Sequence, residues 1–284
     1  MEKQQQEDLT ASTFPIHFQK EKQIPKKKGP QTLQTILLGS SLPIVLVILW
    51  ELLSRLEVFP SYQLPAPSVV LQTIGSMLQD GSLWSHVGIT IFRVFAGFII
   101  GTAGAIVLGA MVGLYKKAEQ LFDPMIQAFR SIPSLAWVPL FILWLGIGEA
   151  SKVTMIAVGV FFPVYLNTVS GITSVDRKLI EVGKMYGLNT FQMIRRIILP
   201  AALPSFLVGL RSGLGLGWMF VVAAELMGAS EGLGYLLVLG QNTLSPEMII
   251  ASIILFAIIG KLTDWGLKQV EKRTLAWQDG LTQS

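Results

Sequence analysis

The sequence contains no cysteine and only two histidines, and this scarcity excludes several kinds of site at once. Without cysteine the chain has no disulfide, no thiolate metal ligand and no cysteine nucleophile. His17 and His86 lie far apart, outside the long apolar segments, and no HExxH motif or other cluster of metal ligands occurs. We therefore expect neither a metal site nor a metalloenzyme.

Charged residues are also scarce, at 14% of the 284 residues. They are gathered into a few blocks, and apolar stretches of membrane-spanning length separate these blocks. A bilayer core of roughly 30 Å requires about 20 apolar residues of helix. The fold class predicted is therefore all-α, a polytopic membrane helix bundle. The net charge of +4 does not indicate nucleic-acid binding, because the cations are placed as topology signals.

Six apolar segments are predicted to span the membrane: 33–53, 88–114, 133–147, 152–173, 203–227 and 248–268. The third is short, so we expect it to be tilted, broken or buried among other helices. Residues 1–32 are polar and predict a mostly disordered cytoplasmic tail. Residues 33–275 then form the transmembrane domain, with its core at 85–272, and residues 276–284 form a second cytoplasmic tail.

The positions of the cations predict the orientation. Eighteen Lys and Arg residues lie in the N-terminal tail, in the loops 115–132 and 174–202 and at the C-terminal end, against two, Arg55 and Lys152, in the alternate loops. Cytoplasmic loops carry the excess of positive charge in membrane proteins. This alternation predicts six spans, with both termini and the loop 174–202 in the cytoplasm.

Glycines recur four residues apart within two of the spans, at Gly97/Gly101, Gly109/Gly113 and Gly209/Gly213/Gly217. Small residues at this spacing let helix backbones approach closely in a membrane. The pattern fits either ordinary packing within one subunit or an interface that moves during function.

One charged and sharply punctuated segment, EVGKMYGLNTFQMIRRIILPAALP, separates the fourth and fifth spans. On a helix, Leu179, Val182 and Tyr186 share one side, and Glu181 and Lys184 form an i,i+3 pair of opposite charge on another. Such a segment is a lipid-surface anchor, a plain connector or a docking element for a soluble partner.

The residues in this segment that commonly start or end helices predict two short helices. Gly187 suits a left-handed cap that ends the first helix, and Asn189 and Thr190 suit the start of the second. The second helix should be stopped or kinked at Pro200.

The same segment resembles the EAA loop of ABC-importer permeases, through Glu181-Val182-Gly183, Gly187, and Ile197-x-Leu199-Pro200. The resemblance implies a type I ABC importer permease fold, and it implies that these residues form the helix that couples to an ATPase subunit. Val182 and Gly183 depart from the two alanines of the pattern. Gly183 should weaken the local helix by up to about 1 kcal/mol relative to alanine.

The stretches LPAPSVV, SIPSLAWVPLFILWLGIGEASK, FFPVYLNT and GLRSGLGLGWMFVVAAELMGASEGLGYL look like the nitrate/sulfonate/taurine subfamily, with the greatest likeness to aliphatic sulfonate permeases. The resemblance implies a permease of the bacterial inner membrane that moves solute from an extracytoplasmic substrate-binding protein to the cytoplasm. Nitrate, taurine or another small molecule are alternative substrates.

The sequence has no GxxxxGK[ST] phosphate-binding loop. We therefore expect a non-catalytic subunit without its own cofactor, with ATP and Mg bound by a partner ATPase. The resemblance implies two permeases, two ATP-binding subunits and a binding protein. The permeases form either a homodimer or a pair with a related permease.

Charged residues within the spans are the remaining candidates for function, because such groups usually face a bundle interior or water. Arg211 and Glu225 are candidates for the translocation path, with the Arg211 guanidinium suited to an oxyanion. The alternatives are structural pairing with a carboxylate on another helix or, for Arg93, snorkelling to the interface. An ion-coupled secondary transporter and a membrane-embedded enzyme are the competing function classes.

Overall fold

The computed structural model describes residues 31–277, and all regular elements in this range are helical, which confirms the predicted all-α class. The chain divides between Leu49 and Trp50 into two units, and the sites described below lie in the second. Helix α1 (Gln31–Arg55) begins in the first unit, and its side chains from 41 to 49 are exposed. The tails predicted at 1–32 and 276–284 lie almost wholly outside the described residues.

After α1 the elements follow one another with short connections. They are α2 (Pro67–Gln79), α3 (Ser82–Leu114), α4 (Lys116–Ser131), the 3₁₀-helix η1 (Ser134–Trp137), α5 (Val138–Leu145), α6 (Glu149–Thr173), α7 (Arg177–Met185), α8 (Thr190–Met193), the π-helical segment η2 (Ile194–Ile198), α9 (Leu199–Leu226), α10 (Leu233–Asn242) and α11 (Pro246–Thr274).

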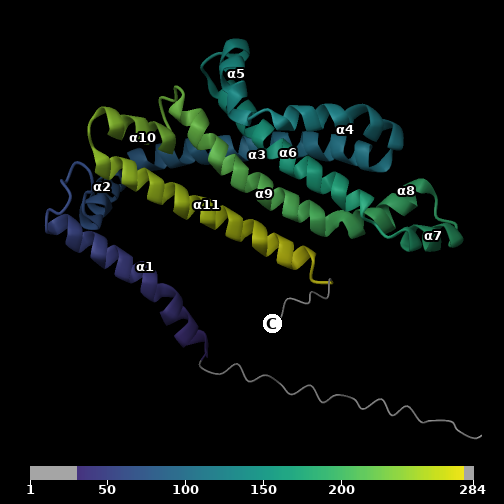
Figure 1. The fold of residues 1–284 in the computed structure, drawn as a ribbon, viewed down its shortest axis with the longest axis horizontal. Coiled ribbons are helices and arrows are strands. Elements are labelled where there is room, and N and C mark those ends of the chain that lie inside the picture. Colours follow the sequence, from purple (N-terminus) through teal and green to yellow (C-terminus); the bar gives the residue numbers. More distant parts are fainter. Residues whose placement is uncertain (1–30, 278–284) are drawn as a thin grey trace, which may run out of the picture. The chain divides into compact units, whose positions relative to one another are not determined.

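Helix α6 is the central helix of the second unit and packs along both α3 and α9 (Figure 1). A Cβ atom on Gly97 of α3 would lie 2.5 Å from Ile156 of α6, and one on Gly213 of α9 would lie 2.9 Å from Val164 of α6. The glycines thus allow the helices to approach closely. The faces of α3 and α9 on which glycines recur every four residues therefore pack against α6 within one protomer.

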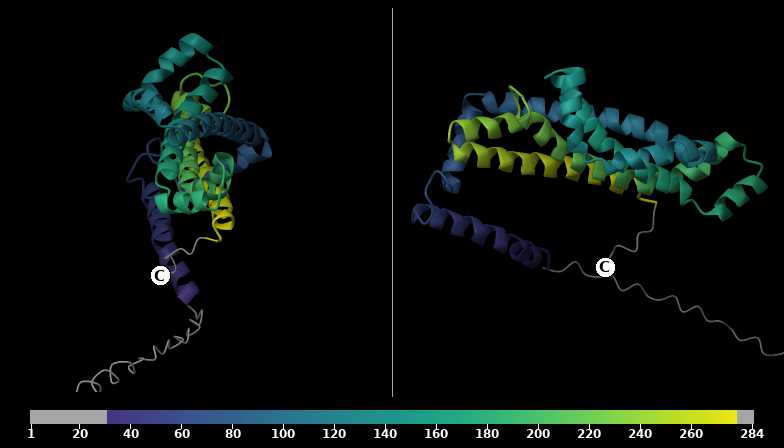
Figure 2. Two further views of the ribbon diagram at one scale, coloured as in Figure 1. Left: turned by 90° about the vertical axis from the view of Figure 1, so that its right-hand side faces the viewer. Right: turned by 45° about the horizontal axis from the view of Figure 1, so that its top comes forward.

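Short helices lie at the two opposite ends of these long helices. Helices α7 and α8 lie at one end, and α10 lies at the other, where it packs on α9 and α11 (Figures 1 and 2). The first end is called the α7–α8 end below, and the second the α10 end.

The predicted count of six spans is confirmed only in part. Four helical stretches of the described chain are long and apolar enough to cross a membrane: Ser82–Leu114, Glu149–Thr173, Thr190–Leu226 and Pro246–Thr274. A fifth is counted only if two helices bent by 86°, Lys116–Ser131 and Leu135–Leu145, form one span.

The short third span, predicted at 133–147, is the broken one. Helix α5 has only eight residues, with a proline in its first turn, and Pro133 precedes η1. Proline has no N–H to continue a preceding helix, which accounts for the break between α4 and α5.

Candidate functional site

The charged segment forms two short helices joined by a tight turn, here called the α7–α8 hairpin (177–193). Asp176 caps α7 by accepting a hydrogen bond from the Lys178 backbone N–H. Gly187 ends it at φ +68°, and Leu188 N–H donates to Gly183 O at 3.1 Å, as in a Schellman cap. Asn189 begins α8 with a reciprocal capping box to Gln192. The predicted caps at Gly187 and Asn189 are confirmed.

Gly183 is buried where α7 packs on the following segment. A Cβ atom there would lie 2.7 Å from Ile197 Cδ1 and 2.7 Å from Met193 Sδ. From the sequence alone, this glycine predicts only a weaker local helix. In the structure its missing side chain lets two parts of the EAA-like motif, around Gly183 and Ile197, pack directly against each other.

The second helix of the hairpin does not stop at Pro200, and it runs into α9 through η2. Leu199 N–H donates to Ile194 O, five residues back, so the turn before Pro200 is widened. A proline removes the N–H that would continue the normal i→i−4 pattern, and a single π turn is one way to accommodate it. Helix α8, η2 and α9 therefore form one continuous helical stretch, Thr190–Leu226, with a wide turn at η2.

An apolar surface covers the outside of the hairpin. Met185 is 86% exposed and Tyr186 is 82% exposed, and Leu179 and Val182 are about half exposed on the same helix. Glu181 is exposed beside them. Its predicted pairing with Lys184 is wrong, since neither side chain forms an ion pair with any described residue. Exposed apolar side chains on a well-capped, rigid element are typical of a docking surface.

A buried ionic cluster lies at the α10 end, centred on Arg93 of α3. Its guanidinium binds Glu149 of α6 through both Nε and NH2, each at 2.6 Å, and Glu225 of α9 through NH1 at 2.7 Å. Lys152 adds a second cation, 3.1 Å from Glu149. The Arg93 side chain is 2% exposed and that of Glu225 is 0% exposed, whereas Glu149 is 46% exposed. Two cations and two carboxylates thus balance each other and join three long helices.

The same cluster holds the connection between α9 and α10. Arg93 NH1 donates to Glu231 O, and the backbone N–H of Gly234 donates to Glu225 Oε2 at 2.7 Å. Gly232 has φ +123°, and a Cβ atom there would lie 2.5 Å from Glu225 and 2.7 Å from Arg93. Only glycine satisfies both the backbone angle and the space.

Thr90 completes the hydrogen bonding of this cluster. Its hydroxyl donates to Glu225 Oε1 at 2.8 Å and accepts from Leu233 N–H at 2.9 Å. Glu225 therefore receives hydrogen bonds from a guanidinium, a hydroxyl and a backbone amide. A buried carboxylate with this many donors is well compensated in its ionised form.

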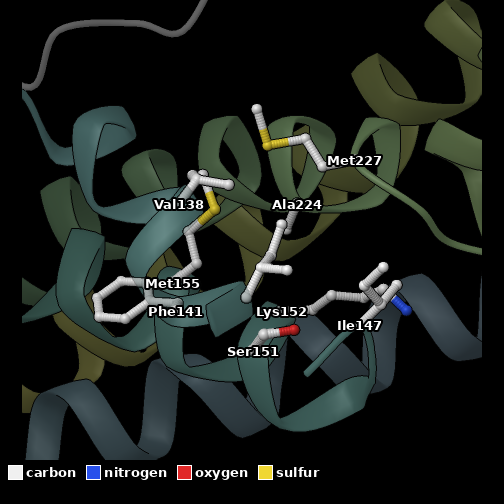
Figure 3. Close-up of a pocket in the computed structure, with 9 residues that line it drawn as sticks. Val138, Phe141, Ile147, Ser151, Lys152, Met155, Ala224 and Met227 are labelled. Atoms are coloured by element: carbon white, nitrogen blue, oxygen red, sulfur yellow. The ribbon is translucent and has the colours of Figure 1, made fainter. Parts of the chain in front are cut away.

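Beside the cluster, α5, α6 and α9 enclose a small hollow of about 20 Å³. Figure 3 shows Ser151 and Lys152 among apolar side chains that include Phe141, Met155 and Met227. A volume of this size holds about one water molecule. The hollow is therefore too small for a solute with several heavy atoms.

The two path candidates occupy different environments. Arg211 is one-third exposed and pairs with Asp264 at 3.2 Å and Glu271 at 3.1 Å, both on α11. Glu225 has no exposed surface in this conformation. The contact between Glu225 and Arg93 was not predicted from the sequence. The predicted topology could have suggested this contact, because it places Arg93, Glu149 and Glu225 near the same face of the membrane.

Comparison with known proteins identifies the family. The family described as binding-protein-dependent transport system inner membrane component matches residues 101–276. The chain belongs to this family. It is thus the membrane permease of a binding-protein-dependent transport system, and the match includes the hairpin and most of the cluster.

Several known proteins align with most of the length of this chain. A protein named aliphatic sulfonates transport permease SsuC from Bacillus subtilis is 40% identical over 85% of this chain and 87% of its own length. SsuC of Escherichia coli is 39% identical over 83% and 90%. The taurine transport system permease TauC of Escherichia coli is 32% identical over 89% and 93%.

Solved structures share the fold of this transport-system component. The MetNI methionine ABC transporter in an inward-facing conformation has a TM-score of 0.56 at 20% identity, over 69% of this chain and 96% of that chain. An amino acid ABC transporter has a TM-score of 0.54 at 17% identity, over 70% and 95%. The fold is therefore that of ABC importer permeases.

Proposed function

We propose that this permease imports aliphatic sulfonates and is driven by a separate ATPase subunit that docks on the α7–α8 hairpin. The observation that carries the proposal is the exposed apolar side of α7, held rigidly by the packing of Gly183 on Met193 and Ile197. An amphipathic helix of this kind suits a groove on a soluble partner. Glu181, Val182, Gly187, Leu199 and Pro200 complete the coupling element.

In this proposal the energy for transport comes from a separate polypeptide that hydrolyses ATP. The sequence contains no GxxxxGK[ST] loop, so ATP and Mg bind to the partner ATPase, and this chain is non-catalytic. A two-fold complex of two such permeases with two ATPases places one hairpin on each ATPase.

The proposed orientation puts the α7–α8 end in the cytoplasm, together with both termini, and the α10 end outside. The cation asymmetry of the loops supports this orientation. The six-span topology stays part of the proposal, with α1 and the bent α4–α5 pair as the additional crossings. The exposed carboxylates Glu149 and Glu231 then face the extracytoplasmic binding protein.

The choice of aliphatic sulfonates is supported by the higher identity to the SsuC proteins than to TauC. A sulfonate is an oxyanion, which a binding protein can recognise through arginine or backbone N–H donors. Taurine and nitrate are the alternatives. Calorimetric titration of the partner binding protein with an alkanesulfonate, taurine and nitrate decides among the three.

Reconstitution in lipid vesicles tests the proposed function. With the permease, its ATPase and the loaded binding protein, we expect sulfonate accumulation that requires ATP and proceeds without an imposed ion gradient. Vesicles without the binding protein or without ATP serve as controls. Uptake driven by a proton or sodium gradient in the absence of ATP would instead identify an ion-coupled secondary transporter.

A further inference from the structure

Two adjoining hollows lie beside the hairpin and are together called the groove below. The first has a volume of about 280 Å³ and lies between α3, α6, η2 and α9. The second has a volume of about 230 Å³ and lies between the end of α3 and the hairpin. Leu114, Ile194 and Ile198 line both hollows, so the two adjoin each other.

The two halves of this groove differ in chemistry. The larger half is lined by apolar side chains, among them Ala110, Ile172 and Phe206, and its one hydroxyl, on Thr168, already donates to Val164 O at 2.7 Å. The smaller half has three residues with polar side chains in its lining, Lys184, Tyr115 and Thr190. None of these three polar groups has a side-chain partner among residues 31–277.

The groove also lies where the long helices leave the apolar zone. Helix α3 ends at Leu114, and the exposed Tyr115, Lys116 and Lys117 follow directly. Tyrosine and lysine at the end of a membrane helix mark the level of the lipid headgroups. The groove is apolar in one half and has an unpaired lysine at the level of the headgroups in the other. A molecule with an acyl chain and an anionic head matches this arrangement.

We propose that the groove binds an anionic phospholipid, with one acyl chain in the apolar half and the phosphate beside Lys184. A free phosphate would leave the apolar half unfilled, and a neutral lipid would leave Lys184 without a counter-charge. Because Ile194 and Ile198 belong to η2, the bound lipid contacts the wide turn between the hairpin and α9. The binding itself does not depend on the proposed coupling role.

The test measures lipid retained by the purified complex of permease and ATPase. Complexes are prepared in an equal mixture of phosphatidylglycerol and phosphatidylcholine, stripped with detergent and analysed by native mass spectrometry. Wild type should retain phosphatidylglycerol in preference to phosphatidylcholine. Lys184→Gln should lower this retention about fivefold, the equivalent of the roughly 1 kcal/mol that one lysine contributes at an anionic surface.

Ala110→Phe, which fills the apolar half, should lower retention of the same lipid. Matched controls are Lys178→Gln, on the same helix outside the groove, and Ala257→Phe, at an exposed position of α11. Both controls should retain lipid like wild type.

Equal retention of the two lipids by wild type, or unchanged retention in Lys184→Gln, would overturn the proposal. Displacement of the lipid by a short-chain alkanesulfonate would overturn it as well and would identify the groove as a cargo site. These results are independent of ATP hydrolysis, so they are distinguishable from a failure of the proposed function.

Discussion

At the scale of single residues, the ionic cluster at the α10 end depends on one arginine. Arg93 is the cation that neutralises the fully buried Glu225, and it also holds Glu149 and the Glu231 carbonyl. Removing one partner of a buried pair leaves the other charge without compensation, which costs far more than removing both. The effect of a substitution in this cluster therefore depends on whether it leaves a buried charge without a partner.

We expect Arg93→Met to destabilise the protein by about 3–5 kcal/mol, because Glu225 stays buried without its cation. The double variant Arg93→Met/Glu225→Met should be more stable than Arg93→Met alone. The measurement is the fraction of monodisperse protein left after heating, by fluorescence-detected size exclusion. Arg55→Met, which breaks an exposed pair with Glu51, is the control and should have little effect. Strictly additive effects of the two cluster substitutions would argue against direct pairing.

Gly183 gives a second prediction at the same scale. The atoms that a Cβ would approach, Ile197 Cδ1 and Met193 Sδ, are the ends of flexible side chains and can turn away. Gly183→Ala should therefore retain activity and strengthen α7 by up to about 1 kcal/mol. Gly183→Val should push α7 off η2 and reduce stimulation of ATP hydrolysis by the loaded binding protein.

The control for this pair is Gly215→Val on α9, where a Cβ atom would meet nothing within 4 Å. It should leave the stimulation unchanged. Full stimulation in Gly183→Val would show that the contact between α7 and η2 does not transmit the ATPase signal.

At the scale of elements, α9 connects the two sites. It begins directly after η2 and ends at Leu226, one residue beyond Glu225, and its 28 residues span about 42 Å. One continuous helix thus links η2 to the ionic cluster. The connection between α9 and α10 follows directly and is held by that cluster.

Arg211, near the middle of α9, links α9 to α11 through ion pairs. Because it is paired with Asp264 and Glu271, we expect Arg211→Gln to lower the amount of assembled complex and to leave transport per assembled complex unchanged. Vesicle uptake normalised to complex content measures both quantities. Asp264→Asn should behave in the same way. A loss of transport at normal assembly would assign Arg211 to the translocation path instead.

At the scale of the whole molecule, local features were predictable and long-range pairings were not. The hairpin could be read from the sequence because Gly187 and Asn189 cap helices through neighbours within a few residues. Arg93 and Glu225 are 132 residues apart, and nothing local in either segment encodes their contact. The widened turn before Pro200 was also missed, since proline permits either a stop or a continued helix.

The docking of the α7–α8 hairpin on a separate ATPase is tested most directly by site-specific crosslinking. Since the chain has no cysteine, Tyr186→Cys introduces the one thiol of this subunit, at a side chain that is 82% exposed. Ser230→Cys, exposed in the connection between α9 and α10, is the control for the opposite end. Each variant is labelled with a photoactivatable maleimide before the ATPase subunit is added, and the reassembled complex is illuminated. We predict that Tyr186→Cys crosslinks to the ATPase subunit and Ser230→Cys does not. No ATPase crosslink from Tyr186→Cys, or equal crosslinks from both positions, would contradict the docking.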